Sequence, residues 1–270
     1  MKKQVSIFVL SLLPLMLHAY DVQVDGIWYN LLDNNAAEVT YASFTGSSYY
    51  GDVIIPATIT HESNTYSVTS IGRSAFTKCG NLTSVTIPNT VTSIGLGAFY
   101  KCTQLTSIVI PNSVTSIGVQ AFMDCSALTS VTISDNLTTI GRQAFSGCNN
   151  ITSLTIPEGI TTIDEGVFEG CGRLTSFTIP NGVTQIGTNA FSSCASLSTI
   201  SIPNTVVSIS NGAFMRSGLS SITLPNSINT IGVEAFKSCK NLQSIVIPNS
   251  VTSIGEYNQE IKGETNVEII

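Results

Sequence analysis

The stretch that decides the fold is Val91–Ser113, which reads VTSIGLGAFYKCTQLTSIVIPNS. A displacement of 23 residues brings it onto a closely similar segment, and the match recurs through most of the chain of 270 residues. Self-similarity at a fixed period of roughly 20–50 residues is typical of repeat architectures, in which each unit buries its apolar face against its neighbours. One spacing is 22, from Val206 to Ile228. Units begin at Val68, Val91, Val114, Leu137, Ile160, Val183, Val206 and Ile228, and a partial ninth runs from Val251 to Gly255.

The first half of each unit has the pattern of a strand, as in LTSIVIP over residues 105–111. Because side chains alternate across a strand, Leu105, Ile108 and Ile110 should point inward, while Ser107 and Val109 should point outward. Proline ends this stretch in seven of the eight units, with Ser134 as the exception. Proline donates no ladder hydrogen bond and therefore suits a strand end.

The second half of each unit follows the pattern VTSIGxxAFxxC. It begins as a short strand, and its fifth position is Gly, Asp or Ser, which favour helix N-caps. The Ala-Phe pair follows three and four residues later, on one face of a short helical turn. We therefore expect each unit to contain a strand, a corner, a short strand, and one or two helical turns.

The consensus LTSxTIPNxVTSIGxxAFxxC, over residues 68–255, resembles the BspA-type leucine-rich repeat of bacterial surface proteins. Leucine-rich repeats carry an L-x-x-L-x-L strand, and L-x-x-V/I-x-I-P is close to it. The resemblance implies an α/β-type repeat solenoid, a right-handed horseshoe with a concave parallel β-sheet and short helical turns. It also implies export, and adhesion to host matrix proteins or other cells in some members. The family has no shared catalytic residues, so none is carried over.

The first 19 residues have the features of a secretory signal peptide: Lys2 and Lys3, then an apolar core over 5–17, and Ala19 before the cut. The core is short for a membrane span of about 20 residues, although a membrane anchor is the alternative. We therefore expect a secreted or cell-surface protein of bacterial type, with no integral membrane span in the mature chain.

Two flanking segments differ from the repeats. Residues 20–67 hold six of the eight tyrosines and the one tryptophan, and their alternating stretches predict an N-terminal β cap with a hairpin over residues 59–68. Residues 256–270 carry a glutamate at every fourth position from Glu256 to Glu268. We expect an acidic C-terminal tail that covers the last open edge, with an acidic contact site as the alternative.

The charge balance excludes some partners. Eleven Lys and Arg face 17 Asp and Glu, the net charge is −6, and only 10% of residues are charged. A nucleic-acid binder needs a basic face, so we expect no nucleic-acid partner and no attraction to anionic membranes. Serine and threonine must cover much of the exterior.

The seven cysteines share one repeat position, with Ser217 in the unit that lacks one. This spacing predicts one thiol per coil, a buried ladder of small apolar spacers. Disulfides between adjacent coils are the alternative in an oxidising compartment, but parallel Cβ directions suit them badly. The full set is Cys79, Cys102, Cys125, Cys148, Cys171, Cys194 and Cys239.

Catalytic and metal motifs are missing from the sequence. The histidines are His18 and His61, so no histidine pair is available outside the signal peptide. We find no G-x-S-x-G, P-loop or G-x-G-x-x-G motif, and we predict no enzyme, no cofactor and no metal site. Four acidic residues lie close together in sequence, for which a solvated face is favoured over calcium binding. They are Glu158, Asp164, Glu165 and Glu169.

Two lines of outward strand positions form the candidate ligand-binding face, which we call the hydroxyl face. It should be flat, nearly uncharged and repetitive, although threonine also simply suits an exposed strand. Its first line is Ser84, Ser107, Ser130, Ser153, Ser176, Thr199, Ser221 and Ser244; its second is Thr86, Val109, Thr132, Thr155, Thr178, Ser201, Thr223 and Val246.

These observations predict an exported, non-enzymatic protein-binding module, an adhesin or cell-surface recognition protein that uses the hydroxyl face. The alternative is a carbohydrate-binding or structural envelope protein, with a glycan as a possible partner. The cap residues Trp28, Tyr29, Tyr49 and Tyr50 would then be the stacking platform.

Overall fold

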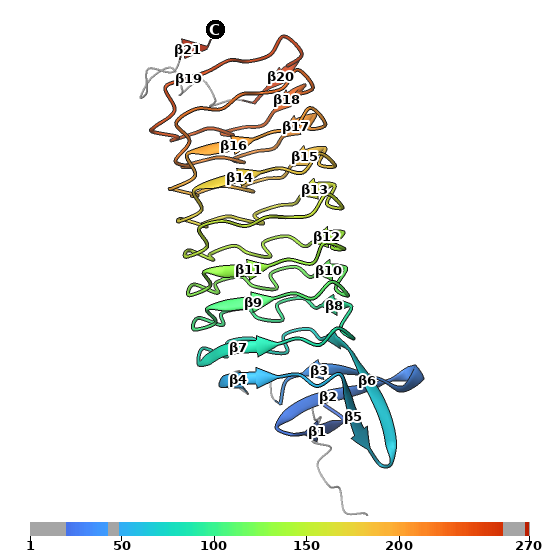
Figure 1. Cartoon of the computed structure of the whole chain (residues 1–270). Helices are drawn as coiled ribbons and strands as arrows, with labels where there is room; N and C mark the ends of the chain where they lie inside the picture. The colour runs from blue at the N-terminus through green and yellow to red at the C-terminus, as the bar shows by residue number, and fades with distance from the viewer. Residues whose placement is uncertain (1–19, 43–48, 256–267, 270) are drawn as a thin grey trace, which may run out of the picture.

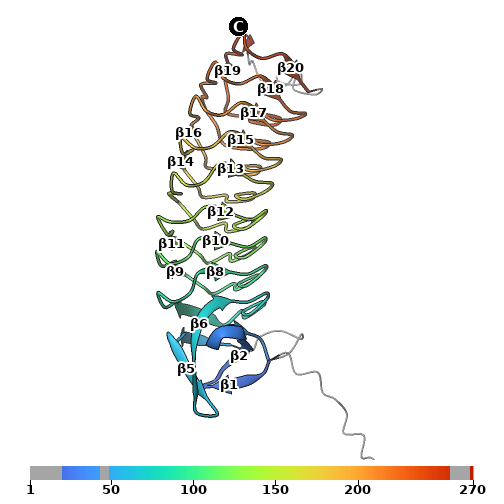
Figure 2. The same cartoon turned by 90° about the vertical axis from the view of Figure 1, so that its right-hand side faces the viewer.

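The computed structural model describes residues 20–42, 49–255 and 268–269. The expected signal peptide and most of the expected acidic tail lie outside the described residues. The described part is a long column of stacked coils that begins at a β-rich cap and bends only gently (Figures 1 and 2). The predicted repeat solenoid with parallel sheets is confirmed.

The cap is a small β structure that continues into the first coil. Strands β1, β2 and β3 form an antiparallel meander, and β3 pairs in parallel with β6. The predicted hairpin is present as β5 and β6, with Glu62 and Ser63 in the left-handed conformation at its turn. The bounds are β1 Val22–Val24, β2 Ile27–Leu32, the 3-10 turn η1 Asp33–Asn35, β3 Ala36–Thr40, β5 Thr58–His61 and β6 Asn64–Ile71.

The first half of each coil contributes to what we call the first sheet. Its ladders are β4–β7, β9–β11, β14–β16 and β19–β21, all parallel. Figures 1 and 2 together place these strands on the side that faces the viewer in Figure 1. The bounds are β4 Gly51–Ile54, β7 Leu82–Thr86, β9 Ser107–Val109, β11 Ser130–Thr132, β14 Ser176–Thr178, β16 Thr199–Ser201, β19 Ser244–Ile245 and β21 Glu268–Ile269.

The short strands of the second half form the second sheet, which is also parallel. It runs from β6 through β8 and β10 to β12, and resumes from β13 through β15, β17 and β18 to β20. The bounds are β8 Ser93–Ile94, β10 Ser116–Ile117, β12 Thr139–Ile140, β13 Thr162–Ile163, β15 Gln185–Ile186, β17 Ser208–Ile209, β18 Thr230–Ile231 and β20 Ser253–Ile254.

The core is one continuous apolar column between the sheets and the turns. A phenylalanine from each coil stacks on the next, beginning with Phe76 on Phe99 at 4.9 Å between ring centroids. Tyr49 extends this stack into the cap, 4.6 Å from Phe76. Six of the seven buried thiols, all but Cys79, donate to a phenylalanine carbonyl of the preceding coil, as from Cys102 Sγ to Phe76 O at 3.0 Å.

The expected helical turns are absent from the described coils. Among the described residues, the only helical element is η1, which lies in the cap. The stretch after each short strand is instead a series of β-turns. Ser74 and Lys78 are left-handed, with φ of 57° and 58°, which breaks any helix. Alternate N–H groups bond in two directions: Ala75 N–H donates to Gly72 O of its own coil at 3.3 Å, and Phe76 N–H donates to Ala98 O of the next coil at 2.7 Å. A helix would use its N–H groups internally, whereas these turns hold adjacent coils together.

The glycine at the fifth position of the second half is not a helix N-cap but a close-packing site. A Cβ on Gly118 would lie 2.6 Å from the carbonyl carbon of Gly95, and one on Gly187 would lie 2.7 Å from that of Asp164. Asp164 occupies this position in its own coil, and there the second sheet is interrupted between β12 and β13. The stacked rings of Phe145 and Phe168 are correspondingly 6.0 Å apart. The aspartate side chain thus coincides with a separation of neighbouring coils, whereas the smaller Ser210 at the same position leaves β15 and β17 paired.

Candidate binding face

The first sheet presents the hydroxyl face to solvent. Fifteen of its sixteen residues are exposed, and Ser84 is half-buried. Parallel pairing holds equivalent residues side by side, with Ser107 opposite Ser130 and Val109 opposite Thr132. Between them, Leu105, Ile108 and Ile110 are buried as predicted. The structure thus brings the predicted residues together on one surface, as the two-residue alternation requires.

Beside each sheet, one line of hydroxyls donates to backbone carbonyls of the preceding coil. Beside the first sheet, Thr129 Oγ1 donates to Thr106 O at 3.1 Å and Thr175 Oγ1 donates to Thr152 O at 3.2 Å. On the second sheet, Thr92, Thr115 and Thr138 each donate from Oγ1 to the threonine carbonyl of the preceding coil, at 3.2, 3.4 and 3.1 Å. On the hydroxyl face, only Ser84 donates to another side chain, and no other hydroxyl of that face has a partner within the described residues. These hydroxyls are therefore available to a ligand as donors and acceptors.

Strand β4 extends the face into the cap, which the sequence prediction missed. Asp52 lies opposite Ser84, and Ile54 lies opposite Thr86. Hydrogen bonds from Ser84 Oγ at 2.6 Å and Thr83 Oγ1 at 2.8 Å lower the pKa of the Asp52 carboxyl. Ile54 is 72% exposed and Tyr50 is 80% exposed. The stretch VIIP at residues 53–56 does resemble the repeat's own strand in the sequence, but the predicted face did not include it.

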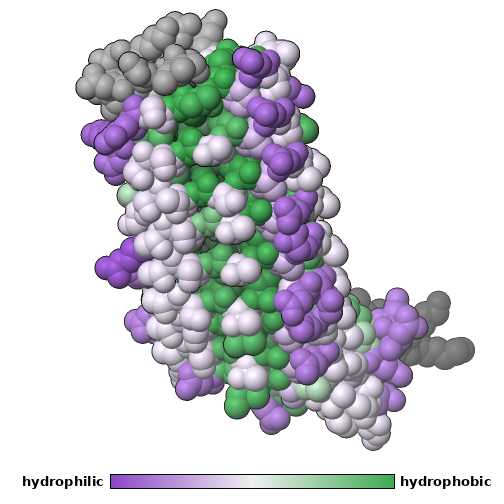
Figure 3. Space-filling model, turned by 45° about the horizontal axis from the view of Figure 1, so that its top comes forward, coloured by the Kyte–Doolittle hydropathy of each residue, from purple (hydrophilic) through white to green (hydrophobic). Residues whose placement is uncertain are grey.

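Apolar surface runs along the face as well. Figure 3 shows a lengthwise apolar band on the side of the first sheet, interrupted by weakly polar residues and flanked by more hydrophilic ones. Ile54, Val109 and Val246 are exposed members of the same line as the threonines. The face thus combines uncharged hydrogen-bonding groups with apolar contact area, a composition found in protein interfaces.

The cap aromatics do not form the stacking platform that a carbohydrate site would need. Tyr29 and Tyr49 are buried in the core, and burial raises the pKa of both hydroxyls. Trp28 is half-buried against Tyr49, with 5.2 Å between ring centroids. The Tyr49 hydroxyl donates to Thr40 O at 2.5 Å. Only Tyr50 of the four is exposed, because the others close the end of the solenoid.

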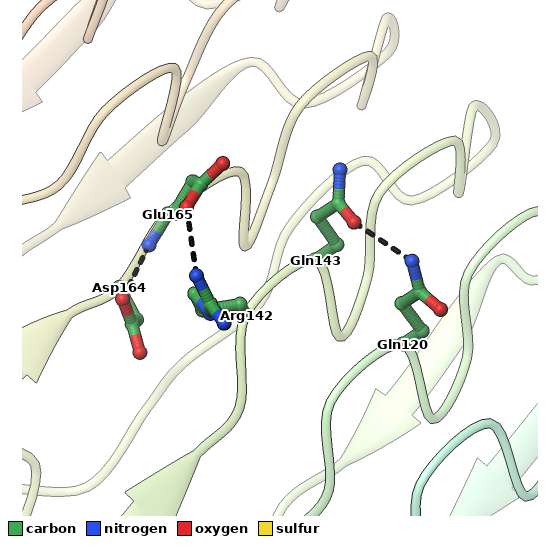
Figure 4. Close-up of polar contacts among 5 residues, drawn as sticks. All are labelled: Gln120, Arg142, Gln143, Asp164 and Glu165. Atoms are coloured by element: carbon green, nitrogen blue, oxygen red, sulfur yellow. Dashed lines mark hydrogen bonds and ion pairs between the residues drawn. The ribbon is translucent and has the colours of Figure 1, made fainter.

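The acidic residues are held by separate protein contacts. Glu165 pairs with Arg142 at 3.2 Å between Oε2 and Nη1, and its N–H donates to Asp164 Oδ1 at 2.7 Å (Figure 4). Glu158 Oε2 accepts from the backbone N–H of Asn181 at 2.9 Å. Burial and the Glu165 charge raise the pKa of Glu169. Among the described residues, no group of three or more His, Cys, Asp or Glu comes together in a geometry that could hold a metal ion.

The cysteines form a line of buried free thiols, one per coil except where Ser217 replaces cysteine. Burial raises the pKa of Cys194 to about 12 and also raises those of Cys148 and Cys171. Buried thiols of raised pKa are poor nucleophiles. Their role here is packing and the hydrogen bond to the preceding coil.

Two parallel sheets, a phenylalanine stack and a 23-residue period define a leucine-rich-repeat solenoid. The family model described as "BspA type Leucine rich repeat region" matches residues 69–194 and 161–262, in 6 copies, and this chain belongs to that family. No curated protein matches the chain. Within the described residues, no helix is both long enough and apolar enough to cross a membrane.

Solved structures from bacteria are similar to this chain. A leucine-rich repeat protein from Bacteroides ovatus ATCC 8483 is 29% identical with a TM-score of 0.73, over 88% of this chain and 68% of that one. A leucine rich cell surface protein from Faecalibacterium prausnitzii A2-165 is 31% identical with a TM-score of 0.57, over 87% of this chain. This chain spans 55% of that second protein.

Proposed function

We propose that this chain is an exported, non-enzymatic protein-binding module that uses the hydroxyl face to recognise a protein partner at the bacterial cell surface. The observation that carries the proposal is the set of exposed hydroxyls, Ser84 excepted, that have no partner among the described residues and are aligned by the stacking of the coils on an almost uncharged sheet. A protein partner can satisfy these groups and cover the apolar band between them.

Family membership supports a role in protein interaction at the surface. The F. prausnitzii relative is named a cell surface protein, and leucine-rich-repeat proteins generally mediate protein interactions. Adhesion to host matrix or to another cell is the specific form that we propose. A glycan partner is less well supported, because three of the four cap aromatics face the core rather than solvent.

A paired set of variants tests the face. Thr132→Lys with Thr178→Lys places two charges on exposed positions of the first sheet, and Thr139→Lys places one on an exposed position of the second sheet. We expect the first pair to weaken capture of matrix proteins or partner-cell surface proteins at least about tenfold, through desolvation of the new charges. The second-sheet variant should bind normally. Equal binding by the unaltered chain, the double variant of the first sheet and the second-sheet variant would contradict the proposal.

Location is tested separately. The chain expressed in its native bacterium should fractionate with the cell surface or the medium, and a purely cytoplasmic location would contradict export. A glycan array with the same variants distinguishes the carbohydrate alternative, since that alternative predicts saturable binding to a sugar.

A further inference from the structure

One coil of the solenoid is shorter than the others, and the missing residue lies next to the hydroxyl face. The corner CASL at residues 194–197 becomes SGL at 217–219 in the following coil. Gly218 N–H donates to Cys194 O at 3.0 Å, and the Cα of Gly218 lies so close to Ala195 O that no Cβ would fit. The shortened corner is therefore drawn tightly against the preceding coil.

The strand that follows this corner does not pair with β16. Ser220 N–H donates to Ser198 O at 3.2 Å, but beyond it no backbone hydrogen bond joins residues 199–202 to 221–223 in the described chain. Between β14 and β16 the equivalent backbone bond is present, since Ile179 N–H donates to Ser201 O at 3.1 Å. The first sheet is interrupted at other coils too, but this interruption coincides with the 22-residue coil.

β16 and residues 221–223, which do not pair with each other, line an open hollow of about 430 Å³ on the hydroxyl face. Its volume lies within the range of about 300–1,000 Å³ that is typical of ligand pockets. Thr199, Ser201, Ser221 and Thr223 supply hydroxyls, Asn204 supplies an amide, and the Ile200 and Ile222 side chains lie between them. Neither a charged nor an aromatic residue lines it.

We propose that this hollow is the specificity site of the hydroxyl face and that it takes an uncharged, extended peptide segment of the protein partner. The inference rests on the function proposed above. The backbone groups of residues 199–202 and 221–223 do not bond to one another, so a peptide backbone that lies along the hollow can supply partners for them. The neutral lining excludes a preference for charged side chains, and the absence of an aromatic ring from it disfavours a sugar ring.

The test uses a defined probe, the acetylated and amidated pentapeptide Ser-Thr-Val-Thr-Ser, titrated into the isotopically labelled chain. We expect backbone amide shifts to change at residues 199–204 and 221–225. The same peptide N-methylated at alternate amides cannot donate all its backbone hydrogen bonds, and it should bind about tenfold more weakly.

Matched variants separate the hollow from the rest of the face. Ser221→Phe fills the hollow, while Ser130→Phe makes the same change at the equivalent exposed position of a paired strand. We expect peptide binding to be lost only in Ser221→Phe. Thr223→Val keeps the shape of the side chain but removes its hydroxyl, and it should weaken peptide binding several-fold. This variant replaces Ser221→Phe in the test if the phenylalanine variant does not fold.

Two outcomes would overturn the inference: shifts elsewhere or none at all, or equal affinities for the two peptides and the two phenylalanine variants. Either outcome leaves the lysine variants of the hydroxyl face as an independent test. The two proposals separate if the double variant Thr132→Lys with Thr178→Lys loses partner capture while Ser221→Phe captures the partner normally. That result would refute the role of the hollow as the specificity site and would leave the proposed binding face intact.

Discussion

Replacing Gly141 by alanine should destabilise the solenoid in a way that can be calculated from its contacts. An added Cβ would lie 2.6 Å from the carbonyl carbon of Gly118 in the preceding coil, which is backbone and cannot rotate away. The two coils would have to separate at this point. Asp164 shows the consequence, since the second sheet has no pairing between β12 and β13 where that side chain stands.

The size of the effect follows from the bonds that separation would break. Thr138 N–H donates to Thr115 O at 2.9 Å, Gly141 N–H donates to Ile117 O at 2.8 Å, and β10 pairs with β12. At about 1 kcal/mol for each hydrogen bond, two or three bonds amount to about 2–3 kcal/mol. Ser210 retains its bond to Ile186 O at 2.9 Å, so some relaxation is possible. We therefore expect a loss of about 2 kcal/mol in the free energy of unfolding.

Urea unfolding with an unchanged m-value measures this loss, and hydrogen exchange at the Thr138 and Gly141 amides locates it. Gly80→Ala is the matched control, because a Cβ there meets only Thr103 Oγ1 at an ordinary 3.4 Å. That variant should be neutral or stabilised by about 0.4–1 kcal/mol through the unfolded chain. A difference of less than about 0.5 kcal/mol between the two variants would refute the close-packing explanation.

The remaining predictions concern the same coils. Asp164→Gly should allow β12 and β13 to pair, so that hydrogen exchange at the Thr161 amide slows and stability rises by about 1 kcal/mol; unchanged exchange would contradict this. A thiol reagent should find no reactive cysteine in the native chain within minutes and seven in the unreduced, denatured chain, and a count below seven would indicate disulfides. The pKa of the Glu169 carboxyl is raised above 4.5, so the folded chain binds the carboxyl proton more tightly than the unfolded chain does. The stability that this proton contributes is therefore lost as the pH rises through the raised pKa. Glu169→Gln should therefore raise the melting temperature at pH 7 but not at pH 4, and an equal shift at both would show that charge is not responsible.

The periodic part of the fold follows from the sequence because alternation and spacing are properties of one chain segment. Leu105, Ile108 and Ile110 are buried, and Val109 is exposed, as a strand requires. The helical turns were predicted wrongly because the deciding interaction lies between coils. The first left-handed position holds Ser, Gly, Gln, Asn or Glu in different coils, and the second holds Lys, Asp, Gly, Ser or Arg, so no single residue type indicates them. Within one coil, a glycine at the position of Gly95 is typical of a helix N-cap. Its close contact with the preceding coil becomes visible only when the coils are stacked.

The candidate site was predicted unevenly for the same reason. The outward positions of the hydroxyl face follow from alternation, whereas the place of β4 depends on where the cap chain returns to the first sheet. The 22-residue spacing is visible in the sequence, but its effect on the pairing of residues 221–223 with β16 is not. A shorter corner could equally have been absorbed in the turns, and only the three-dimensional contacts of Gly218 show that it was not.

The distribution of unpaired groups connects the fold to its function. A regular coil satisfies many of its own hydrogen bonds, through alternate N–H groups in the turns and through one line of serine and threonine hydroxyls beside each sheet, and such groups are not available to a partner. Recognition needs groups that the fold leaves free. On the first sheet they include the exposed hydroxyls of the hydroxyl face, and between β16 and residues 221–223, where the repeat changes length, they include backbone groups as well. The residues that repeat most faithfully therefore build the scaffold, and we propose that the departures from the repeat determine which partner it binds.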